Sequence, residues 1–134
     1  GVGAYEAAFD RVVIPALEIY QPEIIIVPSG FDGGANDPLG RQMMTSEGFK
    51  SLTMKLKRAA TKLCDGKILM THEGGYSAAT VPFFAHAVIE SLAEIETNVV
   101  DPFQNIIGKM GQQDLQPHQN DLIKEAESLL KNIK

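Results

Sequence analysis

Cysteine is almost absent from this 134-residue sequence, which has a single one, Cys64. A lone cysteine cannot form an internal disulfide, so a disulfide-stapled extracellular scaffold is excluded and the expected location is the cytoplasm. Cys64 follows apolar Leu63 near the end of a predicted helix. We therefore expect a buried, inert thiol there rather than a nucleophile.

Clustered basic charge and long apolar runs are also lacking. Lys and Arg number 12 against 17 Asp and Glu, for a net charge of −5. This balance argues against a nucleic-acid surface, which needs clustered cationic side chains. No run reaches the roughly 18 apolar residues of a membrane span, and the first residues lack the basic and apolar regions of a signal peptide. The length and a hydrophobic fraction of 44% predict one domain at most, with a single modest core.

The first third of the sequence predicts a helix, a strand and a long loop. Apolar residues at helical spacing predict a helix over residues 5–20, which Pro15 should kink because it lacks a backbone donor. The unbroken apolar run at 23–27 is typical of a strand buried on both faces of a parallel sheet. Six glycine, asparagine and proline residues break every period between residues 29 and 44, which predicts a loop.

The remainder continues the alternation of helices and strands. We expect a helix over residues 46–63 capped by Thr45 or Ser46, a strand at 67–71, and a helix through 83–92 with Pro82 in its first turn. Residues 101–116 are expected to form an irregular surface segment before a final amphipathic helix over residues 122–133. The alternation predicts an α/β fold with a parallel sheet. Two strands are too few for a self-sufficient sheet, so at least one flank should need a neighbour.

Both predicted strands are followed by glycine-rich loops. The first loop contains Gly30-Phe31-Asp32 and then Asp37-Pro38-Leu39-Gly40, and the second contains Glu73-Gly74-Gly75-Tyr76. In open α/β sheets ligands bind beyond the carboxyl ends of the strands, where glycine lets the backbone approach closely. Simpler interpretations stay open for each loop taken alone. An aspartate in such a loop is often a turn former, as expected for Asp37, and a Gly-Gly-Tyr turn can form an anion-binding nest.

Together the two loops resemble those of the histone deacetylase and acetylpolyamine amidohydrolase family, in particular its bacterial class II-like members. The resemblance extends from about residue 5 to residue 103. It implies that residues 1–134 are the C-terminal portion of a single deacetylase-like domain, with a parallel-sheet, three-layer arginase/deacetylase-like fold. Residues 104–134 would add an irregular segment and a C-terminal helix.

The resemblance also assigns roles in the site. It implies that Asp32 is the last zinc ligand and Tyr76 the catalytic tyrosine, and that Leu39, Gly74 and Gly75 bind substrate. A carboxylate at a strand end suits zinc, and a tyrosine hydroxyl on a glycine turn can donate to a developing oxyanion. The implied activity is zinc-dependent hydrolysis of an acylated (acetylated) lysine or polyamine amide by metal-bound water, in the intact protein.

The sequence departs from the family pattern in its histidines. The family takes two further zinc ligands from an Asp-x-His motif and its base from a His-His pair, and none of His72, His86 and His118 belongs to either. We expect His72 to serve in packing or hydrogen bonding, His86 to be a satisfied core histidine, and His118 to be solvated. With one zinc ligand of three, the chain alone is expected to be inactive.

Two further expectations concern what completes the chain. The unfinished sheet predicts either a homo-oligomer or pairing with an N-terminal segment of the same protein. The alternative function is a non-catalytic α/β assembly module or scaffold fragment, in which the recognisable loops remain without chemistry.

Overall fold

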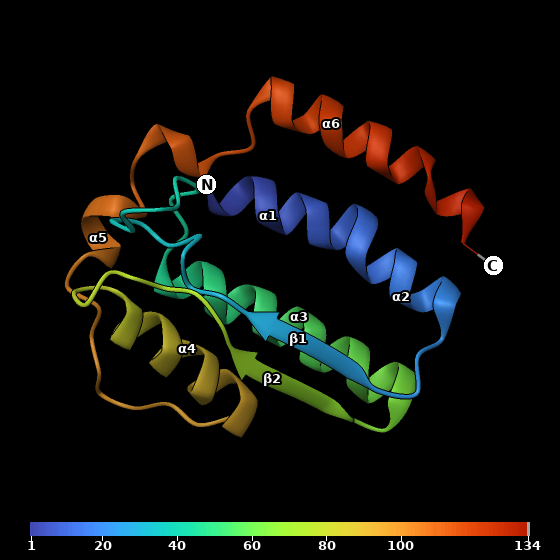
Figure 1. Ribbon diagram of the computed structural model, residues 1–134, viewed down its shortest axis with the longest axis horizontal. Helices are drawn as coiled ribbons and strands as arrows, with labels where there is room; N and C mark the ends of the chain where they lie inside the picture. The colour runs from blue at the N-terminus through green and yellow to red at the C-terminus, as the bar shows by residue number, and fades with distance from the viewer. Residues whose placement is uncertain (134) are drawn as a thin grey trace.

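A computed structural model describes residues 1–133 as an α/β unit (Figure 1). The parallel α/β class and the order of its main elements agree with the sequence prediction. The main elements are α1 (Val2–Ala8), α2 (Ile14–Tyr20), β1 (Ile25–Ser29), α3 (Ser46–Cys64), β2 (Ile68–His72), α4 (Val81–Ala93), α5 (Gln104–Ile107) and α6 (Pro117–Ser128).

The two strands pair in parallel, with Ile25 opposite Ile68 and Ser29 opposite His72. The strands therefore end at the same level, and their loops leave from the same end of the sheet. The predicted strand at 23–27 starts and ends two residues early, and the one at 67–71 is displaced by one residue. Pro28 extends β1 although it cannot donate a ladder hydrogen bond, which is tolerated because both strands are edge strands.

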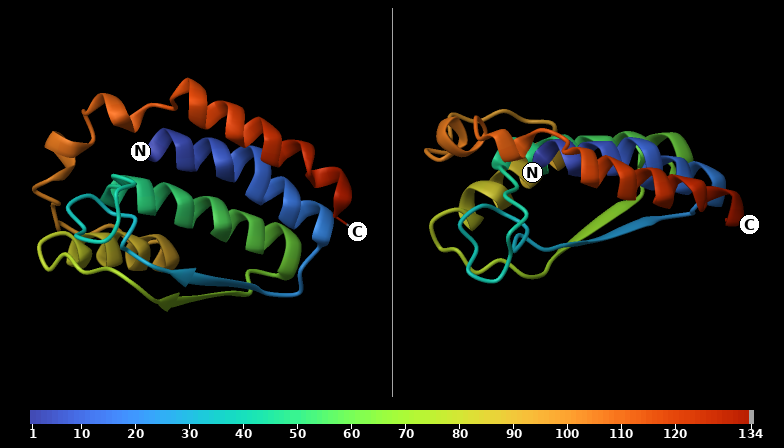
Figure 2. Two further views of the ribbon diagram at one scale, coloured as in Figure 1. Left: turned by 45° about the horizontal axis from the view of Figure 1, so that its top comes forward. Right: turned by 90° about the horizontal axis from the view of Figure 1, so that it is seen from above.

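Helices cover one face of this sheet. Ala59, Ala60 and Cys64 of α3 pack with Ile25, and Ala60 is fully buried, so small side chains let α3 approach the strands closely. Nearer the strand ends, Phe84 and Val88 of α4 pack with the loop residue Phe31 and with Met70 of β2. Figure 2 shows α3 over the strands, the N-terminal helices beside α3, and α6 outermost.

The opposite face of the sheet is bare within residues 1–133. Ile24, Ile26 and Leu69 point to it and are 49%, 59% and 50% exposed. Ile26 and Leu69 are direct partners across the strands, so their side chains form one continuous apolar surface. We call these three side chains the open sheet face. The coverage of 23–27 on both faces that its apolar run predicts is not reached within residues 1–133, because the described helices pack on one side of the sheet. It stays a prediction for the intact protein.

The N-terminal helix passes through Pro15 without ending. A π-helical turn, Phe9–Val13, separates α1 from α2, and the amide of Ile14 donates to the carbonyl of Phe9, five residues back. Proline removes a helical donor and crowds the preceding turn, and such insertions commonly absorb the resulting distortion. The distortion expected at Pro15 therefore takes the form of a wider, π-helical turn immediately before it.

Residues 101–116 are more ordered than predicted. They contain α5 and a 3₁₀ turn, and they bury Ile107 and Gln113. The Gln113 side chain accepts from the amide of Val2 at 2.8 Å and donates to the carbonyls of Met43, at 2.8 Å, and Ile107, at 3.2 Å. A polar side chain at that depth is stable because each of its groups has a partner. The segment is thus a packed connection and not only a surface loop.

The final helix is α6, which begins five residues before the predicted position and lies along the N-terminal helix (Figure 1). Arg11, in the π-helical turn, donates to Asn120 at 2.8 Å and to Glu127 at 2.5 Å. The first and last helices of the chain are therefore linked directly. Across the described residues 1–133, no helix has the length and apolarity required to cross a membrane.

Helix α3 gives a direct test of this arrangement. The Thr45 side chain caps it, accepting from the amide of Gly48 at 3.2 Å, and Thr45 is 3% exposed. Thr45→Ala should lower the free energy of unfolding by about 1 kcal/mol, since it removes a partner from a helix-start amide. Urea unfolding followed by circular dichroism measures the change. Thr61→Ala is the matched control, because Thr61 is exposed inside the same helix and should change stability by less than about 0.5 kcal/mol. Equal stabilities for wild type and Thr45→Ala would contradict the capping role.

Candidate active site

The candidate site lies at the carboxyl ends of β1 and β2. The loop after β1 connects it to α3, and the loop after β2 leads into α4, and both lie on the same side of the molecule (Figure 1). Two backbone hydrogen bonds tie the loops together. Phe31 donates to the carbonyl of Gly74 at 2.7 Å, and Glu73 donates to that of Ser29 at 3.2 Å. The two sequence motifs therefore meet, as predicted from the parallel pairing of their strands.

Phe31 anchors the first loop. Its side chain is 3% exposed and its ring meets that of Phe49 edge to face, with centroids 5.2 Å apart. The centroid of the His72 ring lies 5.3 Å from that of Phe31, which agrees with the packing role, one of two expected for this histidine. Because Phe31 is fixed in the core, the next residue, Asp32, is held at the rim of the loop.

Asp32 lies directly against the glycine turn of the second loop. A Cβ atom at position 74 would lie 2.9 Å from both Cγ and Oδ1 of Asp32, closer than side chains approach one another. A side chain at 74 would therefore push the Asp32 carboxylate out of its observed position, and glycine avoids this contact. Gly75 has φ of +135°, a conformation that side chains rarely adopt, and it turns the chain toward Tyr76.

Asp32, Gly74 and Tyr76 line one open cavity of about 470 Å³. The structure thus brings together three of the five residues predicted for the site. Gly75 adjoins the cavity through the turn, whereas Leu39 is 72% exposed and is not among the lining residues. The Tyr76 side chain is 59% exposed, so its hydroxyl is open to a ligand. The cavity also contains residues that the sequence did not indicate: Tyr5, Gln42, Met44 and Glu73.

Tyr5 reaches the site from α1. Partial burial, and then the negative charge of Asp32, raise the pKa of the Tyr5 phenol above its ordinary value. The sequence showed Tyr5 only as part of an apolar helix face, and nothing in the spacing connected it with residue 32. The position of Glu73 at the site could have been predicted from the sequence, since Glu73 belongs to the Glu-Gly-Gly-Tyr motif itself.

Asp37 connects the same two loops through its carboxylate. Oδ1 accepts from the amides of Leu39 and Gly40, at 2.8 and 3.0 Å, and Oδ2 accepts from the amide of Tyr76 at 2.8 Å. Desolvation raises the pKa of Asp37, but the amides of Tyr76, Leu39 and Gly40 together outweigh it and hold the pKa below its usual value. The turn role expected for Asp37 is present, and the bond to Tyr76 adds a contact between the loops.

The histidines lie apart from this cavity. His118 is exposed, as expected. The prediction that His86 is a core residue is wrong, because its side chain is partly exposed. Its Nε2 lies 3.3 Å from the Thr97 hydroxyl and its Nδ1 lies 3.9 Å from Glu90. In the part of the chain that the structure describes, no group of three or more His, Cys, Asp or Glu side chains could hold a metal ion. Within residues 1–133, Asp32 is therefore not grouped with two further side chains of these types.

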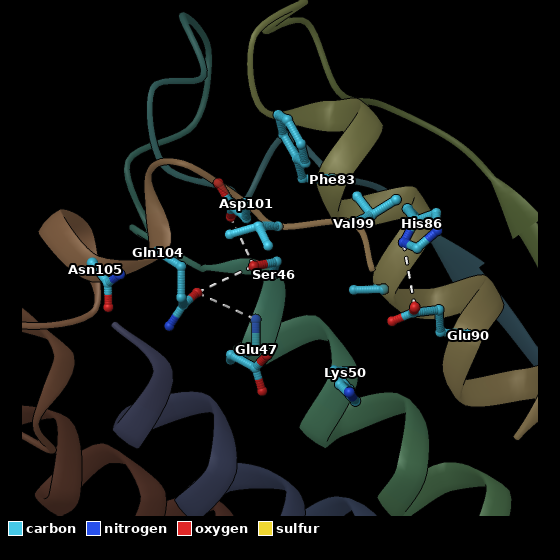
Figure 3. Close-up of a pocket in the computed structure, with 12 residues that line it drawn as sticks. Ser46, Glu47, Lys50, Phe83, His86, Glu90, Val99, Asp101, Gln104 and Asn105 are labelled. Carbon is cyan, nitrogen blue, oxygen red and sulfur yellow. Dashed lines mark hydrogen bonds and ion pairs between the residues drawn. The ribbon is translucent and has the colours of Figure 1, made fainter. Parts of the chain in front are cut away.

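His86 lines a second cavity, of about 270 Å³, between α3, α4 and the segment before α5 (Figure 3). The Ser46 hydroxyl there meets Asp101 at 2.7 Å and Gln104 at 3.1 Å, which fastens the segment to the start of α3. No buried side-chain nitrogen or oxygen atom within residues 1–133 lacks a hydrogen-bond partner. The bonds of Ser46 to Asp101 and Gln104 thus hold the segment against the start of α3.

Comparison with known proteins gives consistent matches. The sequence model of the histone deacetylase domain matches residues 1–92. A histone deacetylase-like amidohydrolase from Pseudomonas aeruginosa is 44% identical over 107 residues, which are 80% of this chain and 28% of that protein. Histone deacetylase 8 of Arabidopsis thaliana is 32% identical over 103 residues, 76% of this chain and 27% of that protein.

The fold comparison agrees. The solved structure of the histone deacetylase Clr3 matches with a TM-score of 0.78 and 28% identity, over 100% of this chain and 20% of that one. The chain spans little more than a quarter of the length of the curated relatives named above. With the domain match covering residues 1–92 and the two loop motifs joined at the strand ends, the chain belongs to the histone deacetylase domain family.

Proposed function

We propose that residues 1–134 are the C-terminal portion of a zinc-dependent amidohydrolase that removes acyl groups, such as acetyl, from lysine or polyamine amides. The observation that carries the proposal is the meeting of Asp32 and Tyr76 in one open cavity at the strand ends. Family membership and the amidohydrolase relative support it. Residues up to about 103 would form the deacetylase-like core, and we place the protein in the cytoplasm, consistent with its unpaired, buried Cys64.

In this proposal Asp32 supplies one of three protein ligands to zinc. A catalytic zinc site keeps three protein ligands and an open position, so the other two ligands and the general base must come from outside residues 1–134. Zinc, when bound, supplies a Lewis acid that activates water and polarises the substrate carbonyl. Asp32 suits the ligand role because its carboxylate lines the cavity and is held against the Gly74 backbone.

Tyr76 would act on the substrate. Its side chain projects from the glycine turn and lines the cavity that contains Asp32. A hydroxyl in this position can donate a hydrogen bond to the amide carbonyl oxygen as negative charge develops there, which stabilises the transition state more than the ground state. The small Gly74 and Gly75 leave room for substrate beside it, and Leu39 would line the acyl-chain path once further segments surround its exposed side chain.

The open sheet face supports a proposal about partners. We propose that an N-terminal segment of the same protein covers Ile24, Ile26 and Leu69 in the intact enzyme, and that copies of the isolated chain pair through this face. An apolar surface beside unpaired strand edges favours association. The alternative function, a non-catalytic assembly module, uses the same face but assigns no chemistry to the cavity.

The first test separates the roles of Asp32 and Tyr76 in the full-length protein. Asp32→Ala should lose zinc and activity together, because a ligand is removed. Tyr76→Phe should keep zinc and lose turnover by on the order of 10²–10³-fold, the usual effect of removing one oxyanion donor. Zinc content is measured by elemental analysis and turnover on an acetyl-lysine amide.

Asp121→Ala, on the exposed surface of α6, is the control and should change neither quantity. The isolated 134-residue chain, dialysed against zinc, should retain no stoichiometric metal and show no turnover. Wild-type turnover in Tyr76→Phe would refute the catalytic assignment. Tight zinc with turnover in the isolated chain would refute the proposal that other segments complete the site.

The second test concerns the open sheet face. The isolated chain should associate in sedimentation analysis, with an average mass that rises with concentration. Ile26→Lys should shift the protein toward monomer, because it places a charge in the centre of the face. Ile106→Lys is the matched control: Ile106 is 65% exposed on α5, away from the sheet, and its change should leave association unaltered. A wild-type chain that stays monomeric at every concentration would contradict this role of the face.

A further inference from the structure

One side-chain carboxylate, that of Asp37, connects the two halves of the candidate site. Its Oδ2 accepts from the amide of Tyr76 at 2.8 Å, across 39 residues of sequence, while its Oδ1 accepts from the amides of Leu39 and Gly40. Two of these amides belong to residues with a proposed role: Tyr76 would donate to the oxyanion, and Leu39 would line the acyl path. A single group thus sets the relative position of both.

The backbone link matters because the side chain of Tyr76 has little packing of its own. It is 59% exposed, so neighbouring side chains constrain it weakly. The turn before it is tied to the first loop at Glu73 and Gly74. Gly75, with its positive φ, then separates those links from Tyr76. The bond from the Tyr76 amide to Asp37 is therefore the contact with the first loop that fixes the direction in which the tyrosine leaves the turn.

The chemistry of this link requires a carboxylate. Ionised aspartate is an acceptor at both oxygens, so it can serve three amide donors at once. The lowered pKa of Asp37 agrees with stabilisation of the ionised form by these amides. Asparagine has one acceptor oxygen and an NH₂ group that would face an amide donor. It can hold the Leu39 and Gly40 amides or the Tyr76 amide, but it cannot hold all three.

We propose that Asp37 is a positioning residue for the reaction: through the Tyr76 amide it holds the Tyr76 hydroxyl in register with the Asp32 carboxylate. The inference rests on the proposed function, because it acts through the catalytic role given to Tyr76. Asp37 itself does not touch the reacting atoms. Its effect should therefore disappear when the Tyr76 hydroxyl is absent, which a purely structural residue would not show.

A double-mutant cycle in the full-length protein tests this dependence. Asp37→Asn should lower kcat on an acetyl-lysine amide by on the order of 10- to 100-fold, since small misplacements of a catalytic group cost this much. Zinc content should stay at the wild-type level. In the Tyr76→Phe background the same change should lower kcat by less than about 2-fold, because the group being positioned is already gone.

Two variants serve as controls. Asp121→Asn makes the same chemical change on the exposed surface of α6 and should leave kcat and zinc content unchanged. Asp37→Glu keeps both acceptor oxygens on a longer arm and should recover part of the kcat that Asp37→Asn loses. If Asp37→Asn fails to fold, as judged by thermal melting, Asp37→Glu takes its place in the cycle. Its smaller loss of kcat should likewise vanish in the Tyr76→Phe background.

The possible results separate the two proposals. An equal loss of kcat in both backgrounds, or loss of zinc in Asp37→Asn, would overturn the positioning role. So would wild-type kcat in both Asp37→Asn and Asp37→Glu. Wild-type turnover in Tyr76→Phe alone would instead refute the catalytic role of Tyr76, and this result is obtained without any Asp37 variant.

Discussion

The parallel, in-register pairing of β1 with β2 is the constraint on which the rest of the structure depends. Because Ser29 lies opposite His72, the loops that follow begin side by side and can bond to each other directly. That pairing is maintained by α3, whose small residues Ala59 and Ala60 pack closely against Ile25. A shift of one residue in either strand would turn its apolar side chains to the opposite face and move one loop away from the other.

The uncovered face of the sheet and the small number of possible metal ligands in the described residues are consistent with each other. Within residues 1–133 the sheet has helices on one face and bare apolar side chains on the other. No group of three or more His, Cys, Asp or Glu side chains there could hold a metal ion, whereas a catalytic zinc site takes three protein ligands. Each deficit can be met by additional segments of a longer domain, and the relatives are about four times as long as the matched region. The loops are nevertheless well organised here, because their mutual contacts lie within residues 29–77.

Local signals in the sequence predicted the elements, and contacts between distant segments account for the errors. The cap at Thr45 and the strands were recognisable, although Pro28 concealed the end of β1. His86 resembled a core residue among apolar helix neighbours, yet Thr97, eleven residues later, holds it at a cavity rim. Gln113 sits in a segment without periodicity, and its three partners are brought together only by folding. The bond between Asp37 and Tyr76 left no trace in either motif taken separately.

Gly74 has a consequence for how this sequence can change over evolutionary time. A Cβ atom at that position would lie 2.9 Å from Cγ and Oδ1 of Asp32, so a mutation at residue 74 requires the Asp32 side chain to move away. That movement would take the carboxylate out of its place in the cavity, while the neighbouring Phe31 amide stays bonded to the carbonyl of Gly74. Substitutions at positions 32 and 74 are thus expected to depend on each other, so the two loops should change together rather than independently.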